Sequence, residues 1–559
     1  MARLPTEKLI MRATEQMHQA ALAAHASRVR RYQAGELNDD EFRPIRLSYG
    51  LYYQLDHTSH MQRIKLPAGV MTAQQARAIA DIAEEYARGV MHVTTRQDIQ
   101  LHWVALENVI PMYERLLAVG ISTRGACSDS VRNITGCYHS GLLPGEPFDV
   151  VPYAFALNEY FLFHPLNLTL PRKFKISFSS CGYDCVQGPV NDIAFYPHLK
   201  DGVPGFRVLA GGGLGAQPFL AKPVQDFVPA EQMLSIAEAI VRVQHRLGER
   251  KNRKKARMKY VVQRLGLERF RAEVEKAWQE VEQEMGSELR RELREMVAAY
   301  RAAQPALPPA PRPEVRGGAF ARWMDTNVFA QKQSGYFGVT VQLPLGDITS
   351  DQMRALVVLA QTYGAGEIRT SNDQNLFLPW IPGDRLHTIW EELCALELGA
   401  PDALHITDVV SCPGADYCSL AVSRSMGMAE VLREELANAH PLIEKLGVFR
   451  IRISGCPNAC GQHHVGDIGL TGMSLQGDDG LHHPHYSLLV GARLGEDGAT
   501  IGRRVHGRFP VAEVPKVVRA IAEWYCQERQ AGEGFADFVA RVGPDRVSEV
   551  ARSAASVVH

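Results

Sequence analysis

With 559 residues, the chain is longer than one hydrophobic core normally serves, so several domains are expected. Its ordinary composition and its net charge of −1 provide no overall field that would attract nucleic acid or an acidic membrane. Charges also interrupt every apolar stretch well before it could span a bilayer. We therefore expect a soluble enzyme whose partners include no nucleic acid and no membrane.

The N-terminal segment is expected to form an amphipathic helix rather than a signal peptide. Glu7 and Glu15 interrupt it, and it has no continuous apolar core. The ten cysteines are too few for a disulfide scaffold in a chain of this length, and thiols that hold a metal cofactor need a reducing compartment. These features predict a cytoplasmic protein.

Strand and helix patterns alternate along the first half. MQRIKLP alternates by two as a strand does, TAQQARAIADIAEEYA has helical spacing behind a threonine cap, and HVTTRQDIQLHWV alternates again as a strand. The charged stretch from Pro229 to Ala298 is predicted to be mostly helical. Residues 301–317 contain five prolines and no apolar period, which indicates an extended linker. This alternation predicts an α+β fold, with mixed α/β sheets covered by helices.

The second half of the chain repeats the first. The segment LPAGVMTAQQARAIADIAEEY, from Leu66, aligns with LPLGDITSDQMRALVVLAQTY, from Leu343, and the same shift also places Trp103 on Trp380. At a nearly equal shift, SFSSCGYDCVQGPVNDIAF aligns with RISGCPNACGQHHVGDIGL, and FRVLAGGGLG aligns with YSLLVGARLG. Three blocks in one order at a nearly constant offset indicate one ancestral unit used twice.

Two short cysteine motifs in the second half predict a metal cofactor. Cys412 and Cys418 lie in SCPGADYCSL, and Cys456 and Cys460 lie in ISGCPNACGQHH. Soft thiolates suit an iron–sulfur cluster, Cu(I) or zinc. Structural zinc pairs usually have the spacing C-x2-4-C, so the C-x5-C motif inside a long globular chain favours a cluster, with zinc as the alternative.

From Arg43 to Gly543 the chain resembles the siroheme-containing nitrite and sulfite reductase family, on these cysteine motifs, the duplication and the basic motifs quoted below. SCPGADYCSL with SGCPNACGQHHVGDIGL is more similar to the bacterial assimilatory sulfite reductase hemoprotein subunit than to plant-type nitrite reductase. The resemblance implies an internally duplicated fold with two ferredoxin-like half-domains and two siroheme- and cluster-type α/β domains. It also implies that the cysteines bind a [4Fe-4S] cluster and that Cys460 bridges to the siroheme iron. The residues implied as cluster ligands are Cys412, Cys418, Cys456 and Cys460.

The resemblance and the patterns together divide the chain into six segments. We expect an N-terminal helical extension over 1–42, ferredoxin-like half-domains over 43–118 and 318–400, a siroheme and substrate domain over 119–300, the proline-rich linker over 301–317, and a cluster and siroheme domain over 401–559.

The resemblance also implies which basic residues meet a small anion. Arg96 in TTRQ and Arg132 in DSVRN match the family's two substrate arginines. Arg257 and Lys259 in NRKKARMKY match its basic-x-basic pair, on one face of an expected extended segment. Sulfite reductases often have two lysines there. Because arginine keeps its proton, Lys259 is the expected proton donor.

Other basic and polar residues are candidates with weaker support, since each would more often be a solvated surface group. Candidates for binding the siroheme carboxylates are Arg63, Lys65, Arg172, Lys173 and Lys175. The glycines at 211–215 lack the order of a phosphate loop and favour a tight turn that approaches the tetrapyrrole edge. His463 and His464 could hydrogen-bond to cluster sulfur, or could simply be packed or solvated.

A second cysteine set lies in the first half. Cys181 and Cys185 repeat the C-x3-C spacing, with Cys127 and Cys137 upstream. A second cluster is one interpretation, but the upstream spacing does not reproduce C-x5-C, so buried small side chains left from the duplication are favoured. Some relatives carry a Tyr–Cys cross-link at a cysteine placed like Cys127. Its tyrosine partner is not evident, because the corresponding strand begins with His60.

The function implied is that of an assimilatory sulfite reductase catalytic subunit, which reduces sulfite to sulfide with six electrons. The alternative is reduction of nitrite to ammonia with the same siroheme and [4Fe-4S] cofactors. No flavin or nicotinamide fingerprint is present, so electrons should arrive from ferredoxin or from a separate flavoprotein subunit. A non-catalytic electron carrier is the competing class, and it would not need the cationic Arg96, Arg132 and Lys259.

Overall fold

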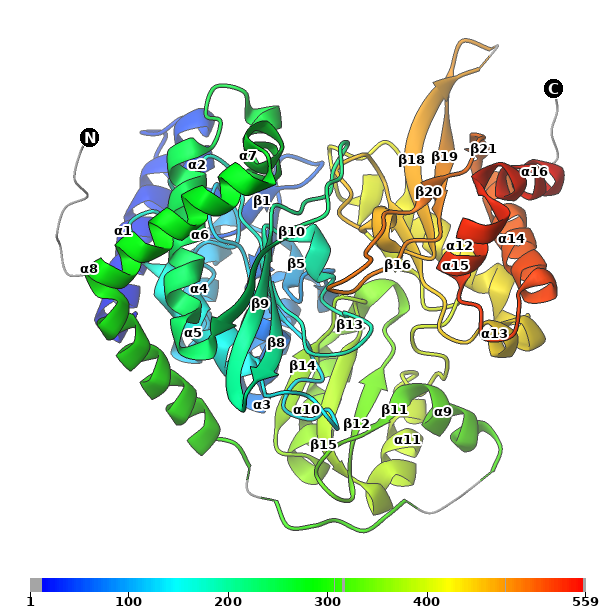
Figure 1. Ribbon diagram of the computed structural model, residues 1–559, viewed down its shortest axis with the longest axis horizontal. Helices are drawn as coiled ribbons and strands as arrows, with labels where there is room; N and C mark the ends of the chain where they lie inside the picture. The colour runs from blue at the N-terminus through cyan, green and yellow to red at the C-terminus, as the bar shows by residue number, and fades with distance from the viewer. Residues whose placement is uncertain (1–12, 306, 314–316, 478, 556–559) are drawn as a thin grey trace.

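The computed structural model describes residues 13–305, 307–313, 317–477 and 479–555, and four β-sheets organise them (Figure 1). The expected N-terminal helix falls partly outside the described residues. Its described part is α1 (Glu15–Gln33), which begins behind the side-chain cap of Thr14. The expected boundary at residue 42 falls inside the next helix, α2 (Asp39–Ser48).

The first two sheets have the same strand order and exchange their last strands. The first runs β1-β2-β5-β4-β13 and the second runs β11-β12-β15-β14-β3, so each sheet ends on a strand that belongs to the other repeat. The strands of the first repeat are β1 (Leu51–Tyr53), β2 (His60–Ile64), β3 (Val70–Thr72), β4 (Val90–Val93) and β5 (Ile99–Val104). Those of the second are β11 (Val328–Ala330), β12 (Tyr336–Val341), β13 (Asp347–Thr349), β14 (Glu367–Thr370) and β15 (Leu376–Pro382).

The exchange joins the two repeats into one unit. Immediately after the exchanged strands come α3 (Ala73–Tyr86) and α10 (Ser350–Tyr363), each closed by a capping box, Thr72 with Gln75 and Thr349 with Gln352. The two helices pack against each other, and one hydrophobic core serves both sheets. The remaining helices around this pair of sheets are α4 (Val109–Ala118), α9 (Ala319–Asn327) and α11 (Leu386–Ala395).

The segment expected as one strand over HVTTRQDIQLHWV is instead a hairpin. The first strand ends at Val93, the second begins at Ile99, and residues 94–98 turn between them. Gln97 takes a left-handed conformation with φ +59°, and its repeat partner Gln374 takes φ +64°. A turn of this kind was not evident because neither position is a glycine. The correction places Arg96 in the turn rather than on a strand face.

The other two sheets are also a repeated pair, ordered β10-β9-β8-β7-β6 and β16-β17-β18-β19-β20, with β21 beside β19. In each, three parallel strands are followed by an antiparallel one. The first contains β6 (Thr135–Gly136), β7 (Ile176–Phe178), β8 (Ile193–Lys200), β9 (Val203–Ala210) and β10 (Lys222–Pro229). The second contains β16 (Val410–Ser411), β17 (Ile451–Ser454), β18 (Ile468–Gln476), β19 (His482–Val490), β20 (Arg503–Arg504) and β21 (Phe509–Pro510).

Helices cover these sheets and confirm the predicted α+β class with internal duplication. The expected helical stretch is present, and its long α8 continues to Ala302, inside the expected linker, along the outer face of the first half (Figure 1). The helices of the first half are α5 (Val151–Leu162), α6 (Met233–Leu247), α7 (Met258–Leu265) and α8 (Leu267–Ala302). Those of the second are α12 (Ser425–Ala437), α13 (His440–Leu446), α14 (Val514–Glu528), α15 (Phe535–Val542) and α16 (Pro544–Ala554).

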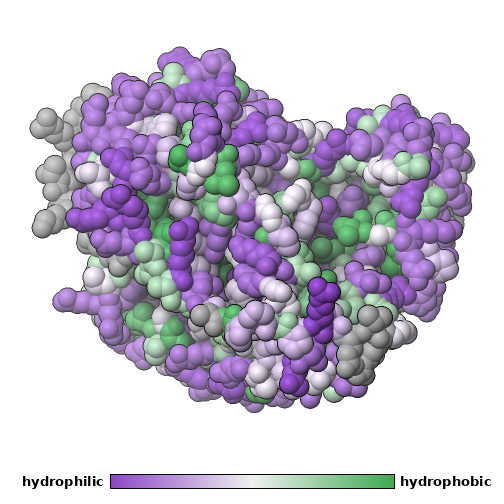
Figure 2. Space-filling view, turned by 60° about the horizontal axis from the view of Figure 1, so that its bottom comes forward, coloured by the Kyte–Doolittle hydropathy of each residue, from purple (hydrophilic) through white to green (hydrophobic). Residues whose placement is uncertain are grey.

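The surface agrees with the balanced composition. No helix among the described residues combines the length and apolarity needed to cross a membrane. On the face shown in Figure 2, hydrophilic residues dominate, and hydrophobic residues gather in the recesses.

Candidate active site

The fold brings the two cysteine motifs of the second half together. Strands β16 and β17 are parallel neighbours, so the loops after them leave the sheet at the same edge. Cys412 directly follows β16, whereas Cys456 and Cys460 follow β17. The backbone N–H of Gly455 donates a hydrogen bond to the Cys412 sulfur at 3.3 Å, across the two loops. The Cys460 thiol interacts electrostatically with the thiols of Cys412, Cys418 and Cys456.

The four thiols fit a cluster better than a single ion. Among the described residues, no three of their sulfur atoms lie within 4.8 Å of one another, as the ligands of one ion would, whereas a cubane distributes its thiolates over four irons. Burial raises the pKa of Cys412 to about 11, and burial also raises the pKa of Cys418 and of Cys456. Such thiols become thiolates when a metal replaces the proton. The zinc alternative is therefore not favoured by the geometry.

At two glycine positions, the loops that carry these thiols pack too closely to admit a side chain. A Cβ added at Gly461 would lie 1.8 Å from the carbonyl oxygen of Ile453, and one at Gly455 would lie 2.8 Å from that of Ser423. Glycine is therefore required for the close approach of the loops. The positions of the thiols are consequently set by backbone packing before any cofactor is bound.

The exposed Cys460 faces basic residues of the first half. The hydroxyl of Thr95, in the β4–β5 turn, donates a hydrogen bond to the Cys460 carbonyl oxygen at 2.9 Å. The Cys460 thiol also interacts electrostatically with cations from two elements of the first half. These cations are Arg63, Lys173 and Lys175. A thiol from the second repeat is thus placed opposite these three cations from the first repeat, which we call the cationic group.

The two predicted substrate arginines lie beside this cationic group. Arg96 donates to Asn191 Oδ1 at 2.8 Å and to the carbonyl oxygen of Asn133 at 2.5 Å, while its buried Nε has no partner among the described residues. Burial lowers the pKa of Arg96 to about 10. Arg132 donates to the carbonyl oxygen of Ser128 at 2.8 Å and interacts electrostatically with Arg96. Both guanidiniums therefore donate to backbone and amide oxygens, while the buried Asp98 interacts with both electrostatically.

Lys173 and Lys175 lie beside these arginines, on one face of an extended segment that leads into β7. Burial and the nearby Arg132 lower the pKa of Lys173 to about 8. Burial and Arg96 hold the pKa of Lys175 well below its usual value. Within the described part of the chain, neither ammonium has a hydrogen-bond partner. Two partly desolvated ammonium groups are thus left available to a bound anion.

The other basic pair, Arg257 and Lys259, is placed differently from the expectation. The segment is not extended, because Arg257 is the N-cap of α7 and Lys259 lies in its first turn. Arg257 forms a buried ion pair with Asp192 at 2.7 Å. The Lys259 ammonium donates to the carbonyl oxygens of Leu214, at 3.0 Å, and of Gln217, and burial lowers its pKa to about 8.

The glycine-rich loop contacts this same pair. A Cβ added at Gly213 would lie 2.9 Å from Arg257 Nη2 and 3.1 Å from Lys259 Cδ. Gly211 adopts φ +90°, which favours glycine. The close approach that Gly213 permits is therefore to two basic side chains, whereas Gly211 approaches Val262.

The remaining candidate residues are divided between the site and its surroundings. Arg63 Nε lies 3.8 Å from Asp98 Oδ2, and burial raises the pKa of Asp98 to about 6. Lys65 donates to the carbonyl oxygen of Arg124 at 3.5 Å, and burial lowers its pKa to about 8. Arg172 instead lies 3.6 Å from Asp129, a residue also bound by Arg253.

The two histidines beside Cys460 are packed side chains. Burial lowers the pKa of His463 to about 2 and that of His464 to about 4, so both are neutral near pH 7. Their rings lie 4.0 Å apart, and in the described structure neither donates to a cysteine sulfur. Of the roles considered for His463 and His464, the structure therefore shows packed side chains.

Sequence reasoning missed Tyr52. Its phenol is in hydrogen-bond contact with the Cys127 thiol, and the Arg63 guanidinium lies 5.2 Å from its ring centre. In the sequence, the tyrosine partner of Cys127 was sought on β2, but Tyr52 lies on the adjacent strand β1, where it is paired with Met61. The two tyrosines just before the predicted strand were the signal that could have identified it. Cys127 therefore belongs to this site and not with Cys137.

Family comparisons match most of the chain. The model described as "Nitrite and sulphite reductase 4Fe-4S domain" matches residues 127–282 and 404–557. The model described as "Nitrite/Sulfite reductase ferredoxin-like half domain" matches residues 53–119 and 329–396. Each model thus matches twice, once in each repeat.

Individual relatives cover similar shares of the chain. The assimilatory ferredoxin-dependent nitrite reductase of Haloferax mediterranei is 31% identical, over 88% of this chain and 83% of its own length. The ferredoxin–nitrite reductase of Synechococcus elongatus is 31% identical, over 82% of this chain and 85% of its own. The solved structure of the Mycobacterium tuberculosis NirA protein has a TM-score of 0.78 and 25% identity, over 97% of this chain and 98% of its own.

Proposed function

This chain belongs to the nitrite and sulphite reductase family, and on that premise we propose that it reduces nitrite to ammonia. The expected preference for sulfite rested on overall motif similarity. The two relatives named above are instead both nitrite reductases, which favours the alternative. The observation that carries the proposal is the position of the Cys460 thiol opposite the cationic group, because an anion bound there would lie between its positive charges and the redox cofactors.

The cofactors of this family are siroheme and a [4Fe-4S] cluster, and the second repeat supplies the cluster ligands in the proposal. When bound, the cluster supplies single electrons to the siroheme, at which the substrate is reduced. Cys460 would be the thiolate that holds both groups, since it is the exposed one of the four and faces the first repeat. The other ligands are Cys412, Cys418 and Cys456.

The first repeat supplies charge and protons. Arg96 and Arg132 orient the anion, because their guanidiniums are held by neutral oxygens and keep their charge for it. Lys173 and Lys175 supply the protons in this proposal. They take the place of Lys259, whose ammonium already donates to the glycine-rich loop.

Arg63 and Lys65 are the proposed partners of the siroheme carboxylates. Both interact electrostatically with Asp98, Arg63 from β2 and Lys65 from just beyond its end. Arg172 is a poorer candidate because it is drawn to Asp129. Ferredoxin is the proposed electron donor, since the two nitrite reductases named above are described as ferredoxin-dependent or as ferredoxin–nitrite reductase.

Sulfite remains the second candidate because of one specific observation. Lys173 and Lys175 form a second basic-x-basic pair, and both interact electrostatically with the Cys460 thiol. The resemblance connects sulfite reductases with two lysines at the pair that it placed at Arg257 and Lys259, so two lysines beside Cys460 keep sulfite as a candidate.

The deciding experiment compares the two anions. Purified enzyme with reduced viologen dye, and then with reduced ferredoxin, should have a kcat/KM for nitrite at least tenfold above that for sulfite. A ratio in favour of sulfite would replace the first candidate with the second. No turnover of either anion by protein that contains siroheme and cluster would reject both.

A further inference from the structure

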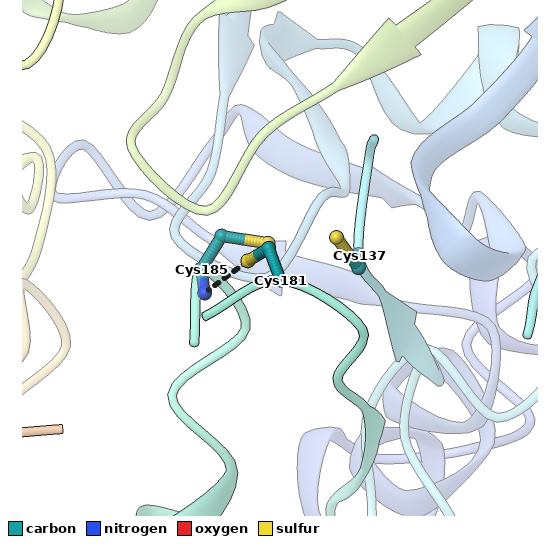
Figure 3. Close-up of side chains that lie close together, drawn as sticks. All are labelled: Cys137, Cys181 and Cys185. Atoms are coloured by element: carbon teal, nitrogen blue, oxygen red, sulfur yellow. Dashed lines mark hydrogen bonds between the residues drawn. The ribbon is translucent and has the colours of Figure 1, made fainter. Parts of the chain in front are cut away.

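Three cysteines of the first half converge at a point outside the site described above. Cys137 follows β6, whereas Cys181 and Cys185 lie in the loop after β7, and their sulfur atoms point toward one another (Figure 3). All three sulfur atoms lie within 4.8 Å of one another, and the residues are 0%, 9% and 2% exposed. The Cys185 backbone N–H donates to the Cys181 sulfur at 3.3 Å. Three buried thiols at this spacing have the geometry of a metal site.

The duplication explains why these thiols meet. Each is the repeat counterpart of a cluster cysteine in the second half, and β6 and β7 are parallel neighbours as β16 and β17 are. The fourth cluster cysteine, Cys418, corresponds to Leu143, which offers no ligand atom. The first repeat therefore retains three of four thiols and draws them closer together than the cluster ligands lie.

A buried imidazole lies beside one of the three thiols, but neither of its ring nitrogens is within 4.8 Å of all three sulfur atoms, so the ring would have to turn toward them to become the fourth ligand. His139 makes a hydrogen-bond contact with the sulfur of Cys181. Its Nδ1 lies 3.0 Å from the hydroxyl oxygen of Tyr183, which lies 3.0 Å from that of Tyr138. Metal-binding histidines commonly use their second ring nitrogen for such a hydrogen bond. Nε2 is therefore the nitrogen left for a metal.

We propose that the three cysteines and His139 bind one structural zinc ion. Three thiolates and an imidazole form the closed tetrahedral shell of structural zinc sites. With Zn–S bonds near 2.3 Å, tetrahedral geometry places the sulfur atoms about 3.8 Å apart, a separation that the observed spacing accommodates. A four-iron cluster would require a wider spread of sulfurs and a fourth thiolate in place of Leu143. Zinc binding releases the thiol protons to solvent and involves no redox change.

The position of the ion gives it a role in the architecture. The three cysteines belong to a hydrophobic cluster with aromatic residues of the second ferredoxin-like sheet. Those residues are Tyr336, Phe377 and Trp380. The ion would join the loops after β6 and β7 at the surface where they pack on this sheet. It would thus stabilise the contact between a cluster-type domain of one repeat and the half-domain of the other.

Metal analysis of the whole purified protein tests the proposal without reference to activity. Elemental analysis of wild-type protein from zinc-supplemented cells should find about one zinc per chain, in addition to siroheme and cluster iron. Cys181→Ser and His139→Ala should each lower the zinc content at least fivefold. Cys526→Ser, which removes a thiol outside both sites, should retain it. The siroheme and cluster absorption should be unchanged in all three variants, which separates this result from failure of the proposed function.

A second measurement covers the case in which the variants fail to fold. Wild-type protein treated with a zinc chelator should unfold at a lower temperature, and added Zn²⁺ should restore the original midpoint. Substitution by Co²⁺ should produce thiolate-to-cobalt charge-transfer absorption. Zinc below one tenth of an ion per chain, iron sufficient for a second cluster, or an oxidised cysteine pair in the wild type would each overturn the proposal. Retention of zinc by Cys181→Ser would do the same.

Discussion

Thr95 of the first repeat donates its hydroxyl hydrogen bond to the backbone carbonyl oxygen of Cys460 in the second, at 2.9 Å. The contact joins the turn that carries Arg96 to the loop that carries Cys460. It therefore sets the separation between the proposed anion-binding residues and the proposed cofactor ligands. Asn372 and Gln462 reinforce the turn from the second repeat by donating to the Thr95 carbonyl oxygen, at 3.0 and 3.2 Å.

Removal of the Thr95 hydroxyl should weaken the contact between the β4–β5 turn and the Cys460 loop. Thr95→Val keeps the shape of the side chain but leaves the Cys460 carbonyl oxygen without its donor, at a cost of about 1 to 3 kcal/mol. We expect a lower unfolding midpoint and a reduced kcat with normal cofactor content, measured by thermal unfolding and steady-state kinetics. Thr471→Val, on β18, is the control with no side-chain hydrogen bond in the described structure. Equal effects of both substitutions would contradict a specific role for Thr95.

The proposed bridging role of Cys460 can be tested by comparing its substitution with that of Cys185, its counterpart in the first repeat. Cys460→Ser should lose siroheme reduction and cluster absorption, because one sulfur serves both groups. Cys185→Ser changes the counterpart of Cys460 in the first repeat and should leave the cluster iron content unchanged. Iron analysis and optical spectra of the two proteins make the comparison. A Cys460→Ser protein with full reductase activity would remove the bridging assignment.

The substrate arginines should act on anion binding rather than on cofactor content. Arg132→Ala removes one charge-assisted contact, worth about 1.5 to 3 kcal/mol, which corresponds to a roughly 10- to 150-fold weaker affinity for the anion. Titration of the enzyme with nitrite or with an unreactive anion measures this directly. Loss of siroheme in the variant would instead identify Arg132 as a cofactor anchor.

Proton delivery should depend on Lys173 and be insensitive to Lys259. The pKa of Lys173 is lowered to about 8, and only the protonated ammonium can donate, so turnover should fall as the pH rises through about 8. Lys173→Met should slow kcat on the order of 100-fold and remove this alkaline decline.

Lys259→Met is the matched control, since burial lowers the pKa of Lys259 to about 8 as well. It should retain the alkaline decline and instead lose stability, because its ammonium donates to the glycine-rich loop. If Lys259→Met alone abolished the decline, the original assignment of the proton donor would be restored.

Features that depend on local spacing could be predicted from the sequence. The nearly constant offset between matching segments identified two copies of one unit, because the same alternation of strands and helices recurs with the same glycines and cysteines. Cys412 and Cys460 could be assigned to one site from their short cysteine motifs and the family resemblance, without knowledge of the strands that precede them. Their meeting requires only that those strands be parallel neighbours, which they are.

The sequence by itself thus determined the duplication, the α+β class and the candidate cluster cysteines. Only the tertiary structure decided which lysines face Cys460, that Tyr52 contacts Cys127, and that Cys137 joins Cys181. Each of these depends on contacts between segments that are distant in the chain. The sequence around a lysine or a cysteine does not reveal which of these distant segments it will contact. The exchange of β3 and β13 between sheets helps to select the neighbour, and it leaves no periodic trace in the sequence.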